Sequence, residues 1–339
     1  MQKIGAQITK HFCTTCGEDK LEPIGRYKTT QNGVRKLYYC KRCQQVLSET
    51  KGTFLEGLRK PLSLISLVLK SRSEGMGLNA ACRVFGLSKN TLIGFERRFQ
   101  ALKSTLMVYA LLHTFIKLIV EGDELYTKVG KNTPVEECRG WTIVFMDRAS
   151  RFIWEMKCGK KDRTLFLYGL RMLRQVIEQT VDITLVTDGE RRYGKILLEI
   201  CHEVIRSGAK GRPPKVLREG LKVRLKNKGS QRSKKKRAKY EAPQPEHPQT
   251  GQNIRDHEIH ANHVEAFNAS VRRRNSAFRR RCNTYAKSVD GLQRTLDLSW
   301  IVHNFIRVHD TTKKVPAVAL GILDRGLQWD EIFKMQKTN

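Results

Sequence analysis

The spacing of apolar residues changes near the middle of the chain, from a helical period to the period of β-strands. Three apolar stretches follow one another there and predict consecutive strands over residues 115–128, 141–147 and 152–158. Helix and strand patterns then alternate, with a helix over 162–178, a buried strand over 183–187, a helix over 195–200 and a strand over 203–205. This order predicts a mixed sheet with helices on both of its faces.

Before this region, residues 61–102 follow a helical period. Helices are predicted over residues 62–69 and 78–85, and the break at 86–88 places Ser88 as the N-cap of a third. Small alanines, a glycine turn and a capped basic helix are typical of a helix-turn-helix, although a plain helical hairpin is the alternative. The residues that would face a DNA groove are Lys89, Asn90, Thr91 and Arg97.

Residues 206–257 interrupt the alternation of helices and strands. The stretch is dominated by Lys and Arg up to Tyr240 and then becomes rich in Pro and Gln. Because such a composition cannot bury a core, we expect the stretch to be mobile until it meets phosphates. After it, the pattern predicts a long basic helix over residues 259–285 and an amphipathic helix over 291–309.

Two pairs of cysteines with the spacing of metal ligands lie near the N-terminus. They enclose a segment with strand-like ends at residues 26–29 and 36–39, so two hairpin ends could bring four thiolates to one tetrahedral point. The pattern predicts a structural zinc site with the ligands Cys13, Cys16, Cys40 and Cys43. A domain this small has little core, so zinc would supply much of its folding free energy. The alternatives are four chance thiols or a redox pair.

The charge of the chain indicates a polyanionic partner. Lys and Arg number 64 against 33 Asp and Glu, which gives a formal net charge of +31 at pH 7. A charge of this size favours nucleic acid, while a ribosome-associated or merely basic protein is the alternative. The most apolar stretch, residues 106–120, contains His113 and Lys117 and is too short to span a bilayer. Without a secretory signal either, we expect a cytoplasmic, nucleoid-associated protein with no membrane partner, whose cysteines bind metal rather than form disulfides.

Three carboxylates stand where a two-metal phosphoryl-transfer site would need them. Asp123 lies in the first predicted strand among apolar residues, and Asp188 follows the buried strand that ends at Thr187. Glu265 lies on the helix after the basic stretch, where Asn268 and Arg272 share its face. Because the acids converge from different elements, they predict a site for two divalent ions.

Each of these acids has a rival. Glu121 shares a strand face with Asp123, whereas Glu124 faces the other way. Asp147 and Asp182 stand near strand ends and could be ordinary turn or edge acids. Glu258 could replace Glu265 if the helix begins early enough. The residues alone leave these alternatives open.

The motifs resemble those of bacterial insertion-sequence transposases. The runs that carry the likeness are Asp123-Glu124-Leu125, Thr187-Asp188-Gly189 with Tyr193-Gly194, and His260 before Val264-Glu265 with Asn268. They look most like the insertion-sequence-one family, whose members begin with a zinc ribbon and a helix-turn-helix. The order of the elements likewise resembles the ribonuclease-H-like fold. The implied domains are a zinc ribbon (1–55), a helix-turn-helix (56–110), a catalytic domain (111–310) with a basic insert (206–257), and a C-terminal tail (311–339).

This resemblance implies that Asp123, Asp188 and Glu265 are the metal ligands of a DDE transposase that uses two Mg²⁺ or Mn²⁺ ions. His260 would match a family histidine and Arg272 the basic residue seven positions after the glutamate. The cations that would hold DNA phosphates are Lys234, Lys235, Lys236 and Arg237 in the insert, and Arg272, Arg273, Arg274, Arg279, Arg280 and Arg281 beyond it. The insert departs from the short family members and suggests an added DNA-tracking element.

The implied reaction is the cleavage and strand transfer of an insertion element by metal-bound water and then by a freed 3′ hydroxyl. The implied partners are the inverted-repeat ends of the element, target DNA, and further copies of the chain in at least a dimer. Two other functions remain. One is a DNA-binding regulator without catalysis, and the other is a structure-selective nuclease or junction resolvase on the same fold. Tyr193 and Tyr285 lie near arginines, but no further pattern indicates a tyrosine recombinase.

Overall fold

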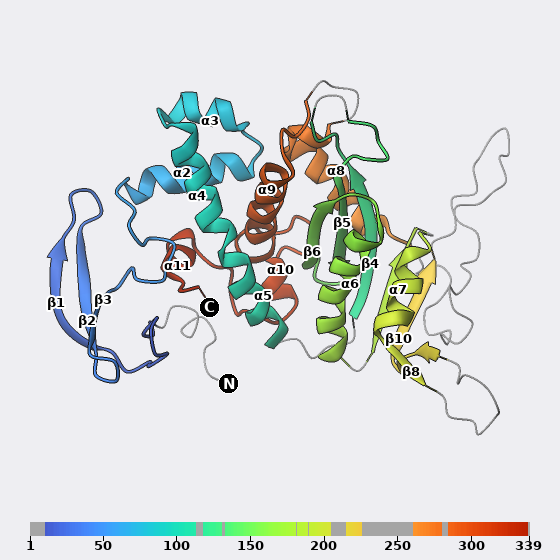
Figure 1. Cartoon of the computed structure of the whole chain (residues 1–339), viewed down its shortest axis with the longest axis horizontal. Coiled ribbons are helices and arrows are strands. Elements are labelled where there is room, and N and C mark those ends of the chain that lie inside the picture. Colours follow the sequence, from blue (N-terminus) through green and yellow to red (C-terminus); the bar gives the residue numbers. More distant parts are fainter. Residues whose placement is uncertain are drawn as a thin grey trace. The chain divides into compact units, whose positions relative to one another are not determined.

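The computed structural model describes residues 11–112, 118–130, 133–180, 182–188, 190–204, 215–225, 260–279 and 284–337. The chain divides into two compact units (Figure 1). Unit 1 combines residues 1–110 with residues 297–339, and unit 2 comprises residues 111–296. Each unit is described separately.

Unit 2 is built on a five-stranded mixed sheet with the strand order β10-β7-β4-β5-β6 (Figure 1). β4, β5 and β6 pair antiparallel, whereas β7 and β10 run parallel to β4. The strands are β4 Leu118–Tyr126, β5 Trp141–Asp147, β6 Ile153–Gly159, β7 Ile183–Thr187 and β10 Leu221–Leu225. The prediction of three consecutive strands followed by a buried fourth is confirmed, and residues 115–117 of the first lie outside the described residues.

Helices cover both faces of this sheet. α6 (Arg163–Glu178) and α7 (Arg192–Ile200) lie on one face, and α8 (Asn262–Arg274) packs against β4 and β5 on the other (Figure 1). Asp162 caps α6, because its carboxylate accepts hydrogen bonds from the backbone of Thr164 and Leu165. The prediction of a mixed α/β sheet with helices on both faces is therefore confirmed.

Two strands lie in the basic stretch that was expected to be mobile until it meets phosphates. β9 (Lys215–Leu217) pairs with β8 (His202–Val204) in a separate two-stranded sheet, and β10 is the fifth strand of the main sheet. The expectation is therefore wrong for residues 215–225. Apolar Leu221 and Val223 alternate there with Lys222 and are buried, but the many surrounding cations obscured this period of two. Residues 205–214 and 226–259 lie outside the described residues.

The helix predicted over residues 259–285 is shorter than expected. α8 ends at Arg274, because Asn275 adopts an extended conformation and its side chain accepts a hydrogen bond from the backbone of Ala277. A 3₁₀ turn, Ser276–Phe278, follows. The next predicted helix is confirmed as α9 (Val289–Ile301), which continues into a π-helical turn at Val302–Ile306.

The N-terminal part of unit 1 is a small three-stranded antiparallel sheet in the order β1-β2-β3. Its strands are β1 Glu22–Lys28, β2 Val34–Cys40 and β3 Gln45–Ser48. The buried core consists of Cys13, Cys40 and Leu47, with three partly buried neighbours. So few apolar residues cannot stabilise a sheet by burial alone, which leaves a role for a bound metal.

Four helices follow along the chain, namely α2 Leu62–Ser73, α3 Leu78–Phe85, α4 Lys89–Gln100 and α5 Leu102–Leu112, and only the last two residues of α5 fall outside unit 1. Gly86 ends α3 with a φ of 60°, in the left-handed region that glycine adopts without strain. Ser88 caps α4 as predicted, since its hydroxyl accepts a hydrogen bond from the Thr91 backbone at 3.2 Å. A buried ion pair of 2.5 Å between Arg72 and Glu96 joins α2 to α4.

The C-terminal segment completes unit 1. It contains α10 (Pro316–Ala319) and α11 (Trp329–Lys334). Phe333 of α11 stacks on Phe54 with the ring centroids 4.7 Å apart. The Gln336 side chain hydrogen-bonds both backbone groups of Phe12 and the carbonyl of Lys51. The segment that the sequence analysis set apart as a tail thus packs against the residues that flank the small sheet.

No helix among the described residues is both long and apolar enough to cross a lipid bilayer.

Candidate active site and metal centre

The acidic site of unit 2 forms where β4 and β7 run side by side. Their parallel register pairs Val120 with Leu185 and Glu121 with Val186. Continued by two residues, the same register sets Asp123 beside Asp188. Parallel neighbours lie about 4.8 Å apart between backbones, so both carboxylates belong to one edge of the sheet. Asp188 is exposed there, which leaves this edge open to a large ligand.

Asp123 is held by α8. Its Oδ2 accepts a hydrogen bond of 2.7 Å from the Asn268 amide, and its Oδ1 accepts one of 2.8 Å from the Glu124 backbone. Burial, followed by the negative charge of Asp188, raises the pKa of Asp123 from 3.8 to about 6. A carboxylate that is costly to ionise beside a second carboxylate is a ready ligand for a divalent cation, because the cation offsets both charges.

Glu124 lies on the opposite face of β4, as predicted. Its Oε2 pairs with Lys161 at 3.0 Å, and the phenol of Tyr193 from α7 lies beside the carboxyl group. Burial raises the pKa of Glu124, against the lowering effect of Tyr193, and the charge of Asp188 adds to the rise. Asp188 therefore interacts electrostatically with an acid on each face of the sheet.

Gly122 makes room for this arrangement. A Cβ atom at Gly122 would lie 3.2 Å from the ring of Phe145 on the neighbouring strand. The ring of Tyr193 packs edge-on against Phe145, with the centroids 5.7 Å apart. A side chain at residue 122 would therefore displace the aromatic pair that holds the Tyr193 hydroxyl beside Glu124.

Buried oxygen atoms without hydrogen-bond partners collect around this site. Seven buried side-chain polar atoms in the described part of the chain lack a partner, and four of them belong to the site. These four are Asn268 Oδ1, on the face of β4 that carries Asp123, and Glu124 Oε1, Thr187 Oγ1 and Tyr193 Oη, of which Glu124 and Tyr193 lie on the opposite face and interact with each other. Buried polar atoms are seldom left unsatisfied, and carboxylate, hydroxyl and amide oxygens are the ligand types that Mg²⁺ and Mn²⁺ prefer. The carboxylates of Asp123 and Asp188, together with the Asn268 amide oxygen on the same face, therefore fit a hydrated divalent cation.

Glu265 is exposed in the first turn of α8. The positive end of the helix dipole favours an anion at this position. Within the described residues, Asp123, Asp188 and Glu265 do not form a group whose ligand atoms all lie within 4.8 Å of one another. The structure thus brings Asp123 and Asp188 together and leaves Glu265 outside such a group, on the helix that also carries Asn268.

The rival acids have other partners. Asp147 accepts hydrogen bonds from the backbone and hydroxyl of Ser150 at 2.7 and 2.5 Å, so it stabilises a turn. Asp182 pairs with Lys222 at 3.1 Å at the opposite end of β7. Glu121 is fully buried and bonded to α8. Glu258 lies outside the described residues.

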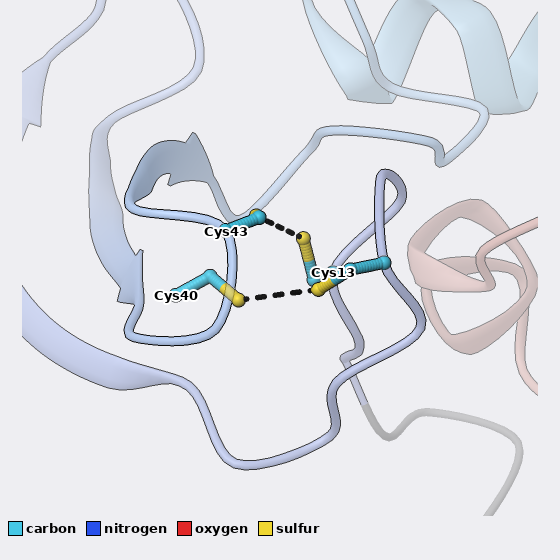
Figure 2. A group of neighbouring side chains, drawn as sticks. Cys13, Cys40 and Cys43 are labelled. Carbon is cyan, nitrogen blue, oxygen red and sulfur yellow. Dashed lines mark hydrogen bonds between the residues drawn. The ribbon is translucent and has the colours of Figure 1, made fainter.

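The four cysteines of unit 1 form the second candidate site. In Figure 2, Cys13, Cys40 and Cys43 point toward a common centre. The sulfur atoms of Cys13 and Cys43 are 3.4 Å apart, and those of Cys16 and Cys40 are 3.5 Å apart. Four thiolates at about 2.3 Å from a zinc ion would be separated by roughly 3.8 Å, whereas a disulfide needs about 2.05 Å. The cluster Cys13, Cys16, Cys40 and Cys43 could therefore bind a structural zinc ion.

The thiols of the cluster differ in their pKa values. Burial opposes the ionisation of Cys13, but hydrogen bonds from the backbone of Cys16 and Thr15 and the neighbouring thiols lower its pKa to about 6. Burial and the other thiols raise the pKa of Cys43 to about 12. Four thiolates this close would repel one another, so full ionisation requires a cation at the centre.

The predicted DNA-binding residues lie in several places. Lys89, Asn90 and Arg97 are exposed on α4, whereas Thr91 is partly buried and bonded to Ser88. Arg272, Arg273 and Arg274 occupy the last turn of α8, and Arg279 is exposed just beyond it. The remaining predicted cations, Lys234, Lys235, Lys236, Arg237, Arg280 and Arg281, lie outside the described residues.

Two residues of the acidic site were not predicted. Lys161 stands next to the α6 cap and reaches Glu124. Tyr193 belongs to the Tyr193-Gly194 run of the resemblance and was also weighed as a recombinase nucleophile, but neither reading gave it a part in the acidic site, where it is fully buried beside Glu124. Its place five residues after Asp188, on the helix that follows, was the available signal. For Lys161 the sequence held no comparable signal, because it comes from another strand connection.

No protein-family model matches this chain, and a search of curated proteins finds no match either.

Proposed function

We propose that this protein is a DNA transposase of the DDE type, similar to the insertion-sequence-one family. The observation that carries the proposal is the pairing of Asp123 with Asp188 at an open sheet edge, beside the buried amide oxygen of Asn268, which lacks a partner. An open, acidic edge suits a ligand that is long, phosphate-rich and too large for a closed pocket. The net charge of +31 supports the same class of ligand.

The architecture supports this proposal. Three antiparallel strands followed by two parallel ones, with helices on both faces, agree with a ribonuclease-H-like fold for unit 2. The helices α2, α3 and α4, with a left-handed Gly86 and a capped α4, agree with a helix-turn-helix in unit 1. Its exposed residues Lys89, Asn90 and Arg97 would read the ends of an element, and the cysteine-bound zinc ribbon would stand beside them in sequence.

In this mechanism Asp123 and Asp188 would hold the divalent cations, and Asn268 keeps the Asp123 carboxylate oriented. Two bound Mg²⁺ or Mn²⁺ ions would activate the attacking water or 3′ hydroxyl and stabilise the leaving oxygen. Glu265 would join the ligands from α8 once DNA is bound. The arginines of the last turn of α8 would hold the phosphate backbone in line with the acids.

The proposed partners are double-stranded DNA, at the inverted-repeat ends and at the target, and other copies of the chain. Two element ends must be held at once, so the active form is proposed to be at least a dimer, associated with the nucleoid. The zinc ion is structural in this scheme, because its four thiolate ligands would leave no open position for a substrate.

The test is cleavage and joining of labelled inverted-repeat DNA by the full chain with Mg²⁺ or Mn²⁺. Asp188→Asn should lower the cleavage rate by at least about a hundredfold, since even supporting residues of metal sites cost 10 to 100-fold. DNA binding should persist or strengthen, because a negative charge beside phosphate is removed. The matched control is Asp182→Asn, at the other end of β7, which removes the same charge and should leave cleavage within about twofold.

The alternatives give different outcomes in the same experiment. Equal cleavage by Asp188→Asn and the parent chain would refute the catalytic assignment. Tight binding of inverted-repeat DNA without any cleavage would indicate a regulator. Preferential cutting of branched junctions over inverted-repeat ends would indicate a structure-selective nuclease.

A further inference from the structure

The helix α8 begins without a cap of its own. Ala261 occupies the N-cap position and makes no side-chain bond, and the His260 ring accepts a long hydrogen bond of 3.4 Å from the Asn262 backbone. The backbone N–H groups of His263 and Val264 instead donate to Oε2 of Glu121, at 3.0 and 2.9 Å. Glu121 belongs to β4, so the helix is capped by a residue more than a hundred positions earlier in the chain.

Glu121 is itself held firmly. Its Oε1 accepts a hydrogen bond of 2.7 Å from Arg148 Nε and lies 2.8 Å from Nδ1 of His263. The same arginine donates through Nη2 to the carbonyl of His260 at 2.5 Å. The carboxylate is fully buried, and its pKa is lowered despite that burial, chiefly by His263, the Val264 backbone and the charge of Arg148. Arg148 thus neutralises the carboxylate and also ties the chain just before α8 to the end of β5.

A second contact fixes the same helix further along. Asn268 bonds to Asp123, two residues after Glu121 on the same face of β4. Two residues of a strand rise about 6.7 Å, and the four residues from Val264 to Asn268 rise about 6 Å along a helix. Because the two rises match, both contacts can be made at once without distortion, and a helix shifted by one residue would lose both.

Glu121, His260 and His263 also lie close enough together to suggest a metal site. The hydrogen bonds of Glu121 argue against a metal ion at this place. Both carboxylate oxygens already accept hydrogen bonds from N–H donors, and one donor is a guanidinium whose positive charge would repel a cation. The cluster has the chemistry of a helix cap instead.

We propose that Glu121 is a positioning residue that caps α8 from the sheet and sets the register in which Asn268 reaches Asp123. Glu265 directly follows Val264, whose backbone N–H bonds to Glu121. The same contact therefore fixes where Glu265, the proposed third ligand, lies along β4. This inference rests on the proposed function only for its catalytic consequence. The cap itself can be tested without any activity.

The first measurement is amide hydrogen exchange of the full chain, with the variant Glu121→Gln. This change keeps the length of the side chain but removes the charge that Arg148 and the helix N-terminus both favour. Exchange should become at least about tenfold faster at His263 and Val264, since losing about 1.4 kcal/mol of cap stability is a factor of ten. Unchanged exchange at these two amides would overturn the proposal.

The second measurement is a double-mutant cycle on DNA cleavage with Glu121→Gln and Asn268→Ala. Each change alone should lower the cleavage rate by about 10 to 100-fold, with inverted-repeat affinity within about twofold. The double variant should lose less than the product of the two losses, because either change loosens the same helix. Strictly multiplicative losses would contradict a shared register.

The two hypotheses fail in different ways. If Asp188→Asn abolishes cleavage while Glu121→Gln leaves both cleavage and exchange unchanged, only the positioning role is wrong. If the chain never cleaves DNA, the exchange result still decides the cap. If Glu121→Gln does not fold, Arg148→Lys is measured instead, since it keeps the charge but loses the second donor to His260. Faster exchange confined to the first turn of α8 would then support the cap, and unchanged exchange would refute it.

Discussion

At the scale of single residues, the two acids of the site differ in their surroundings. Burial makes Asp123 costly to ionise, whereas Asp188 is exposed to solvent. Asp123 is shielded by α8 and bonded to Asn268, whereas Asp188 is exposed at the strand end. The two differ because β4 lies in the middle of the sheet and β7 ends where the chain leaves it. One acid is therefore preorganised, and the other can adapt to a ligand.

The raised pKa of Asp123, about 6 against an ordinary 3.8, predicts that divalent metal binding depends on pH. Below pH 6 a proton competes with the cation for this carboxylate, so Mn²⁺ affinity should fall by up to about tenfold per pH unit. Isothermal titration of Mn²⁺ between pH 5 and 8 checks this. An affinity that stays flat across pH 6, or that falls equally in Asp123→Asn, would contradict it.

The same shift affects the stability of the metal-free chain. The folded state holds the Asp123 proton more tightly than the unfolded state does, so this group's contribution is greatest below about pH 4. The contribution is lost as the pH rises toward 6, and a bound cation, which favours the ionised carboxylate, opposes that loss.

At the scale of secondary structure elements, two helical glycines have opposite roles. Gly169 lets α6 approach β5 closely, because a Cβ atom there would lie 2.1 Å from Ile143 and 3.0 Å from Phe145. Gly94 in α4 has no atom within 4 Å of such a Cβ. The first glycine is therefore required by packing, and the second is not.

We predict that Gly169→Ala destabilises the chain by about 1 to 3 kcal/mol, because overpacking outweighs the better helix propensity of alanine. Gly94→Ala, the matched control, should stabilise it by about 0.5 to 1 kcal/mol. Denaturant unfolding followed by circular dichroism measures both. Equal effects of the two substitutions would show that the close approach of α6 to β5 does not matter.

Some of the secondary structure elements could be predicted from the sequence and others could not. β5, β7, α6 and the cap at Ser88 followed from periodicity and capping residues, because local physics determines them. β10 was missed, since Lys and Arg dilute a short apolar alternation. The cysteine cluster followed from spacing alone. Lys161, Arg148 and the cap by Glu121 did not, because they depend on which strands become neighbours in space.

At the scale of the whole molecule, the small sheet of unit 1 differs from the helical part of the same unit, because it buries few apolar residues and depends on the cysteine cluster. Its three-stranded sheet buries little besides Cys13, Cys40 and Leu47. Structural zinc in sites of this kind contributes folding free energy directly, often about 10 kcal/mol or more. Removal of a zinc ion bound at this cluster should therefore unfold the sheet before it affects better packed regions.

We predict that Cys40→Ser lowers the zinc content of the full chain to well below one equivalent and abolishes exchange protection in β1, β2 and β3. Cys82→Ser, which alters a thiol of α3 outside the cluster, should retain full zinc. Zinc release measured with a colorimetric chelator, together with hydrogen exchange, tests both variants. Protection that survives in metal-free Cys40→Ser would mean that the sheet is stable by itself.

Unit 1 closes only when Phe333 and Gln336 meet Phe54, Phe12 and Lys51. During synthesis on the ribosome, Phe12, Lys51 and Phe54 are translated first. Phe333 and Gln336 are translated last, after the whole of unit 2. The nascent small sheet and its helices must therefore wait, incompletely packed, until translation of the described chain is nearly finished. A chain that stops after unit 2 could fold the five-stranded sheet. It would lack the contacts by which Phe333 and Gln336 hold the N-terminal residues in place.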